Sequence, residues 1–170
     1  VYALWKAGGR PIGAAYKKLH EELGFDLVVL VDGGTDILMR GDEAGLGTPE
    51  EDITSLSAAH GLGLDGSVVA CLGFGVDAFH GVCHAHFLEN VAALARENAY
   101  LGVTALLPEA SEAKLYQEAV AYACARTPRC PSIVGLSIAS AIAGEYGDVH
   151  KTQRTQGSEL WINPLMSMYW

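Results

Sequence analysis

Blocks of apolar residues along this chain predict alternating helices and strands. From Pro11 to Leu23, apolar residues recur at helical spacing, with a proline suited to the first helical turn and Gly24 suited to the end. Residues 25–31, FDLVVLV, form a continuous apolar run rich in branched side chains, which predicts a strand buried on both faces of a parallel sheet. This strand is expected to stop at Asp32.

A second helix and a second strand follow in the predicted order. Thr48, Pro49 and Glu51 match a capping box, in which the Thr48 hydroxyl accepts from the Glu51 amide and the Glu51 carboxylate accepts from the Thr48 amide. The helix that begins there is expected to end near His60. Residues 67–74, SVVACLGF, predict the second buried strand.

The second half of the chain continues this alternation. A helix is expected up to about residue 98, and its apolar stripe consists of His84, Phe87, Leu88, Val91, Leu94 and Ala95. Residues 101–107 predict a third strand, and residues 111–126 predict an amphipathic helix. Residues 133–143 favour a helix because alanine and serine replace branched side chains, and residues 160–170 form an apolar tail.

The alternation of strands and helices predicts an α/β fold. We expect a three-layer arrangement in which right-handed crossovers join a mostly parallel sheet, with helices on both faces. A length of 170 residues predicts a single α/β domain over residues 1–170. Because the chain does not begin with Met, we expect an N-terminally truncated domain, a fragment of a longer chain.

Charge and composition narrow the classes of partner. The formal net charge is −9, from 20 acidic and 11 basic residues, so the overall field repels a phosphate backbone and disfavours nucleic acid as a partner. The hydrophobic share of 50% suits a covered sheet or an interface between identical subunits, which predicts a homo-oligomer.

The cysteines and the apolar runs bear on location. The four cysteines include no CxxC pair, and we expect reduced thiols and a cytoplasmic location. No apolar run reaches the roughly 18–20 residues that span a bilayer, and the first residues lack the regions of a signal peptide. A membrane partner is therefore not expected.

An acidic, glycine-rich loop follows the first predicted strand. Between Asp32 and Asp52 the chain places seven of its 20 acidic residues against one basic residue, Arg40, and five glycines lie between Gly33 and Gly47. Crowded carboxylates repel one another unless a cation or hydrogen-bond donors compensate, and glycines let backbone amides converge on one point. In parallel sheets, ligands bind outside the carboxyl ends of strands, where this loop begins.

Three ligand classes fit the acidic loop. The first is Mg²⁺ or Mn²⁺, for which the candidate ligands are Asp32, Asp36, Asp42 and Glu43. The second is a ribose or sugar, whose hydroxyls would donate to Asp32. The third is an amino acid, with its carboxylate on Arg40 and the amides of Gly33 and Gly34 and its amine on Asp36. The alternative without a ligand is that the acids cap turns or face solvent.

A second loop gathers groups that transfer protons or bind metals. These groups are Asp77, His80, Cys83, His84, His86 and Glu89. We favour His80 or His84 as a general acid or base, because imidazole titrates near neutral pH and Asp77 could fix its tautomer. Zinc is disfavoured because the spacing matches no standard motif, and Cys83 is expected to be a small buried thiol. The competing interpretation of His84 is a hydrogen-bonded core residue.

Near the end of the chain, one segment concentrates polar residues. Its members are His150, Lys151, Arg154, Ser158 and Glu159. The segment could fold over the site and neutralise an anionic substrate group, or it could form a solvated loop, which we favour.

The two loops carry a resemblance to a known family. The stretch LVDGGTDILMRGDEAGLGTPEEDITSL, then CLGFGVDAFHGVCHAHFLE, and finally GSELWINPLMSMYW resemble the domain of unknown function 1152 family through almost the whole chain. Members of that family carry an upstream segment that opens with a glycine-rich strand-to-helix turn, and the resemblance therefore also implies a fragment. The family has no established activity, so the resemblance implies no mechanism.

A shorter likeness concerns the acidic loop alone. Residues 32–37, DGGTDI, resemble a block in the carboxy-terminal domain of D-glutamate cyclase, and the likeness departs at Arg40, where the cyclase pattern has glycine. This likeness implies that Asp32, Gly33, Gly34 and Thr35 bind an amino acid and that the reaction is a metal-assisted lyase or cyclase reaction.

Three functional hypotheses follow. The first is an enzyme of the lyase, cyclase or hydrolase class that acts on a small polar metabolite, amino-acid or nucleotide-like, with Mg²⁺ or Mn²⁺ assistance. In it Asp36, His80 and His84 are catalytic, while Arg40 and Asp77 bind substrate. The second is a noncatalytic nucleotide or metabolite sensor at the same loops. The third is an assembly protein that uses the acidic loop and the apolar tail as interaction surfaces.

Overall fold

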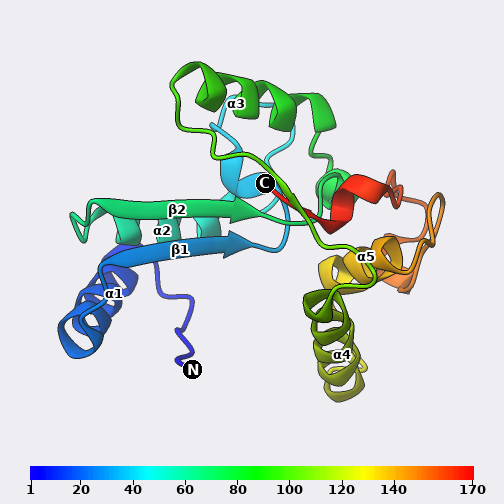
Figure 1. Cartoon of the computed structure of the whole chain (residues 1–170), viewed down its shortest axis with the longest axis horizontal. Helices are drawn as coiled ribbons and strands as arrows, with labels where there is room; N and C mark the ends of the chain where they lie inside the picture. Colours follow the sequence, from blue (N-terminus) through cyan, green and yellow to red (C-terminus); the bar gives the residue numbers. More distant parts are fainter. The chain divides into compact units, whose positions relative to one another are not determined.

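The computed structural model describes residues 1–170 and combines five α-helices with short strands (Figure 1). This confirms the α/β class expected from the sequence. The chain gathers into two compact units, and each contains two separate stretches of sequence. The first unit consists of Val1–Asp32 and Thr48–Ala70, and the second consists of Gly33–Gly47 and Cys71–Trp170.

Two helices and two strands make up the first unit. They are α1 (Gly9–Leu23), β1 (Leu27–Asp32), α2 (Pro49–His60) and β2 (Gly66–Cys71), whose last residue already belongs to the second unit. The sequence predicted all four elements to within a few residues. Helix α1 ends as expected at Gly24, which has a φ of 64° and donates its amide to the His20 carbonyl at 2.9 Å.

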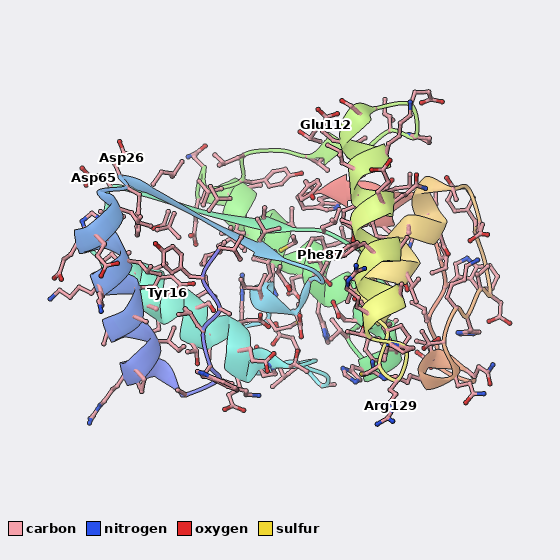
Figure 2. The ribbon with its side chains drawn as sticks, turned by 90° about the horizontal axis from the view of Figure 1, so that it is seen from below. Tyr16, Asp26, Asp65, Phe87, Glu112 and Arg129 are labelled. Atoms are coloured by element: carbon pink, nitrogen blue, oxygen red, sulfur yellow. The ribbon has the colours of Figure 1, made fainter.

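Strands β1 and β2 form a two-stranded parallel sheet (Figure 1). Asp26 and Asp65, which precede the two strands, lie side by side in Figure 2, as the starts of parallel neighbours must. One face of β1 is open: Leu27, Val29 and Val31 are 48%, 51% and 59% exposed. The expectation of a strand buried on both faces therefore differs from the structure: α2 packs against β1, and the face that carries Leu27, Val29 and Val31 stays exposed.

Helix α2 begins differently from the predicted capping box. Pro49 occupies the first helical position as expected, but the Thr48 side chain makes no capping hydrogen bond and its φ is −123°. Three acidic residues in the first turn, Glu50, Glu51 and Asp52, instead supply negative charge at the positive end of the helix.

The second unit contains the remaining elements. In chain order they are η1 (Asp36–Leu38), η2 (Val76–His80), α3 (His84–Arg96), β3 (Thr104–Ala105), α4 (Ser111–Arg126), α5 (Ile133–Ile142), η3 (Gln153–Thr155), η4 (Pro164–Ser167) and β4 (Met168–Tyr169). The helix expected over residues 111–126 has those bounds in the structure, and Figure 2 labels Glu112 in its first turn and Arg129 just beyond its end.

The predicted third strand forms a different sheet from the one expected. Strand β3 has only two residues and pairs antiparallel with β4, with Thr104 opposite Tyr169 and Ala105 opposite Met168. On its other side the tail pairs with the end of β2, where the amides and carbonyls of Cys71 and Trp170 exchange two 2.9 Å hydrogen bonds. The apolar tail therefore supplies the hydrogen-bond partners that a parallel neighbour was expected to supply.

Helix α5 lies at the centre of the core of the second unit. Its residues belong to both core clusters: Ile133 and Ala141 pack with Met166 in one, and Ile138 and Ile142 pack in the other. The Ser132 hydroxyl caps the helix by accepting a 3.0 Å hydrogen bond from the Gly135 amide. Of the two short helices that carry the loops, η2 contacts α5 and contributes Val76 to the first cluster, whereas η1 contacts α3.

None of the four cysteines forms a disulfide. The α-helices are all too short or too polar to cross a membrane.

Shortening a buried side chain of helix α5 should destabilise the second unit. Ile138 is fully buried, and we expect Ile138→Ala to lower the free energy of unfolding by about 2–5 kcal/mol because it leaves a cavity among packed side chains. Chemical denaturation followed by circular dichroism measures the change. Leu115→Ala on α4, where the side chain is 64% exposed, is the control and should change stability by less than about 0.5 kcal/mol.

Candidate functional site

The two loops singled out in the sequence meet inside the second unit. The Thr35 amide donates a 2.7 Å hydrogen bond to Oδ2 of Asp77, and the Thr35 hydroxyl donates a second one at 3.1 Å to the same oxygen. Thr35, Asp36 and Asp77 are 2%, 5% and 6% exposed. We call these three residues the carboxylate cluster.

Glycines let the backbone approach the carboxylate cluster closely. A Cβ on Gly34 would lie 2.9 Å from Oδ2 of Asp77 and 3.0 Å from Oδ1, inside normal contact distance. A Cβ on Gly47 would collide with the Asp36 carboxylate, and Gly47 also has a φ of 64°, which disfavours other residues. The glycine-rich composition of the loop therefore has a packing cause: the carboxylates lie against bare backbone.

Burial changes the acidity of Asp77. Loss of solvent contact, followed by the negative charge of Asp36, raises the pKa of Asp77 from 3.8 to about 6. The hydrogen bonds from Thr35 and the charge of His80 act in the opposite direction and lower the pKa. The outcome is a buried carboxyl group that exchanges its proton close to neutral pH.

A second acid, Glu43, holds the shape of the loop. Its carboxylate accepts hydrogen bonds from the amides of Arg40 and Gly41 at 2.9 Å, and from the Asn90 side chain at 3.1 Å. The backbone hydrogen bond from Arg40 contributes most to lowering the pKa of Glu43 to about 2. The Asn90 amide also donates to the Leu38 carbonyl at 2.8 Å, so α3 is tied to the acidic loop.

Asn90 was not singled out from the sequence. The signal was an amide placed three residues after Phe87, on the buried face of α3, where the predicted stripe instead included Leu88. Leu88 is 46% exposed, whereas Asn90 is 5% exposed. A polar residue on the buried face of a helix indicates a hydrogen-bonding role that a count of apolar positions does not detect.

The two candidate catalytic histidines contact different aromatic rings. His80 ends η2, is exposed, and stacks on Phe79 with ring centroids 3.9 Å apart. His84 begins α3 and packs edge-on against Phe74 at 5.2 Å. Gly81, with a φ of 83°, separates the two helices, so the face that a continuous helix would have shared is absent. His80 is the histidine whose charge acts on Asp77.

The other predicted site residues occupy different surroundings. Arg40 and Asp42 are exposed, and Asp32 ends β1 in the first unit. Gly33 is exposed and lies against Val134, whose Cγ1 would be 3.3 Å from a Cβ at that position. Within the second unit the structure therefore gathers Gly34, Thr35, Asp36 and Asp77, with His80 acting at longer range.

The polar segment near the end of the chain is engaged elsewhere in the second unit. Lys151 forms an ion pair with Glu145 at 2.7 Å. The Arg154 guanidinium donates a 3.3 Å hydrogen bond to the Cys130 sulfur. His150 makes its hydrogen bonds within its own segment. The basic groups of this segment thus have partners other than the carboxylate cluster.

Comparison with known families adds one result. A family model described as "Protein of unknown function (DUF1152)" matches residues 4–170. The chain belongs to this family. Membership confirms the resemblance drawn from the two loops and the tail, and it assigns no reaction. Comparison with curated proteins gives no match, and neither does comparison with solved structures. The likeness to D-glutamate cyclase stays a prediction.

The raised pKa of Asp77 predicts a stability that falls as pH rises. The folded state holds its proton up to about pH 6, whereas an unfolded carboxyl group releases it near 3.8, so the folded state binds more protons between these values. The stabilisation is fully present below pH 3.8, and it is lost as the pH rises from there through about 6. A shift of this size corresponds to at most about 3 kcal/mol, at 1.36 kcal/mol per pKa unit.

Urea denaturation of wild type and Asp77→Asn between pH 4 and pH 8 measures this contribution. Relative to the variant, wild type should lose about 2–3 kcal/mol over this range, because an asparagine can accept both Thr35 hydrogen bonds without titrating. Parallel curves for the two proteins would show that Asp77 has an ordinary pKa. Subtracting the variant removes the effects of other acids such as Glu43.

Proposed function

We propose that the second unit carries the site of an enzyme in which Asp77 acts as a general acid and base on a small polar metabolite. The observation that supports the proposal is the carboxylate cluster itself, in which burial and the neighbouring Asp36 bring the pKa of Asp77 to about 6. General acid–base catalysis is most efficient when the pKa of the group lies near the working pH.

The hydrogen bonding of Asp77 suits proton transfer. Thr35 donates both of its hydrogen bonds to Oδ2, so this oxygen is fixed and the carboxyl group cannot rotate freely. Oδ1, the other carboxyl oxygen, is the atom that would exchange a proton with substrate. His80, exposed on the same short helix, would pass protons between Asp77 and solvent.

The substrate would approach over the exposed residues of the acidic loop, which include Gly33, Arg40 and Gly41. Gly34 itself is buried, and its backbone lies directly against the Asp77 carboxylate. Arg40 would attract an anionic group of the substrate, as expected from the sequence. Proton transfer at a small polar metabolite is compatible with lyase, cyclase and hydrolase chemistry.

Assistance by Mg²⁺ or Mn²⁺ would add to this mechanism without being required by it. Of the four predicted metal ligands, Asp36 is the one in the carboxylate cluster, and a cation there would offset the repulsion between Asp36 and Asp77. Glu43 fits a metal poorly, because backbone amides and Asn90 already converge on its oxygens. Asp42 is exposed.

A thermal-shift screen identifies the ligand and a variant then tests the role of Asp77. Amino acids, nucleotides and sugars are screened with and without Mg²⁺, and compounds that raise the melting temperature are assayed for conversion by mass spectrometry. Asp77→Asn should lower turnover by about 10²–10⁴-fold, since the amide cannot transfer a proton. Asp65→Asn, at an exposed aspartate, should leave turnover within about twofold, as for a surface substitution.

Two results would contradict the proposal. Unchanged turnover in Asp77→Asn would remove the general acid–base role. A compound that binds tightly to wild type but is converted neither by wild type nor by any variant would favour the noncatalytic sensor instead. The expected three-layer sheet, homo-oligomer and cytoplasmic location stay predictions.

A further inference from the structure

An uncharged groove runs along two helices of the second unit. It has a volume of about 470 Å³ and is lined by Tyr116, Val120 and Cys124 of α4, by Val134 and Gly135 of α5, and by Gly33. This volume is within the 300–1,000 Å³ range of small-molecule sites. No charged side chain lines the groove, although the chain contains 20 acidic and 11 basic residues.

One residue of the groove lining belongs to the chain segment that carries the carboxylate cluster. Gly33 forms part of its lining and lies against Val134. The next residue, Gly34, packs against the Asp77 carboxylate, and Thr35 donates its amide to the same group. The groove and the Asp77 carboxylate thus contact neighbouring residues, Gly33 and Gly34, of the same stretch of backbone.

The chemistry of the walls selects the kind of group that fits. Burial, with a smaller contribution from Tyr169, raises the pKa of Tyr116 to about 12, so its ring carries no charge at neutral pH. The Ser132 hydroxyl, which also lines the groove, accepts a hydrogen bond from the Gly135 amide. Neutral walls cannot compensate a buried charge, whereas a tyrosine ring offers a face or an edge to another ring.

We propose that this groove binds the uncharged aromatic ring of the metabolite on which the site acts. The substrate is then a compound with an aromatic ring and a polar group beside that ring. Sugars and aliphatic acids, which have no aromatic ring, are excluded. The polar group extends past Gly33 toward Thr35 and Asp77. The identity of the reacting group rests on the proposed function, whereas binding of the ring to the groove does not.

Cys124 reports on occupancy of the groove, with internal controls in the same protein. Indole is the probe, and alkylation of each cysteine by iodoacetamide is followed by mass spectrometry of peptides. With indole at ten times its dissociation constant, about one molecule in eleven is unliganded, so Cys124 should react about tenfold more slowly. Cys83 and Cys130, which are exposed outside the groove, should react at unchanged rates.

Two tryptophan substitutions on α4 form a matched pair. Val120→Trp fills the groove, so indole should no longer slow the alkylation of Cys124 in this variant. Ala121→Trp places the same side chain at an exposed position outside the groove and should keep the protection. Circular dichroism checks that both variants fold, and Ala123→Leu replaces Val120→Trp if that variant does not.

Three results would overturn the inference. The first is an alkylation rate of Cys124 that indole leaves unchanged, and the second is equal protection of Cys124 by indole in wild type and in Val120→Trp. The third is a Cys124 that does not react with iodoacetamide even without indole, because the groove would then be closed. Asp77→Asn separates this inference from the proposed function. Indole should protect Cys124 fully in that variant, whether or not its turnover is lost.

Discussion

The burial of two neighbouring carboxylates against bare backbone is the constraint on which the candidate site depends. Asp36 and Asp77 carry like charges, and each loses most of its hydration. The structure accommodates Asp77 with two hydrogen bonds from Thr35 and with a pKa that favours the protonated form at mildly acidic pH. Residues with side chains could not replace Gly34 or Gly47, because a Cβ there would meet a carboxylate.

The surrounding structure holds this arrangement from two directions. Glu43 fixes the acidic loop by accepting amide hydrogen bonds, and Asn90 connects the loop to α3. On the other side, Val76 of η2 packs with Ile133 of α5 in the buried core, which fixes the segment that carries Asp77. Asp77, whose pKa is raised to about 6, is thus attached through η2 to the apolar helix α5, whereas Glu43, whose pKa is lowered to about 2, shapes the loop.

The sequence predicted the elements whose signals are local. The helix over residues 111–126 and the end of α1 at Gly24 depend on periodicity and on one glycine, and both were correct. Burial of β1 on both faces and a parallel third strand depended on neighbours that a sequence pattern cannot specify. The contact between Thr35 and Asp77 joins residues 42 positions apart, so the sequence could nominate both but could not pair them. It also could not show that His84 packs on Phe74 rather than beside His80.

The pairing of Cys71 with Trp170 has a consequence for the order in which the molecule folds during synthesis. The ribosome releases the helices and the acidic loop before the residues of β4, yet β4 fills the position between the end of β2 and β3. Until residues 168–170 are synthesised, the antiparallel pairings with Cys71 and Thr104 cannot form. The nascent second unit lacks the strand that joins these two segments, and a strand edge without its neighbour is the kind of surface that promotes aggregation.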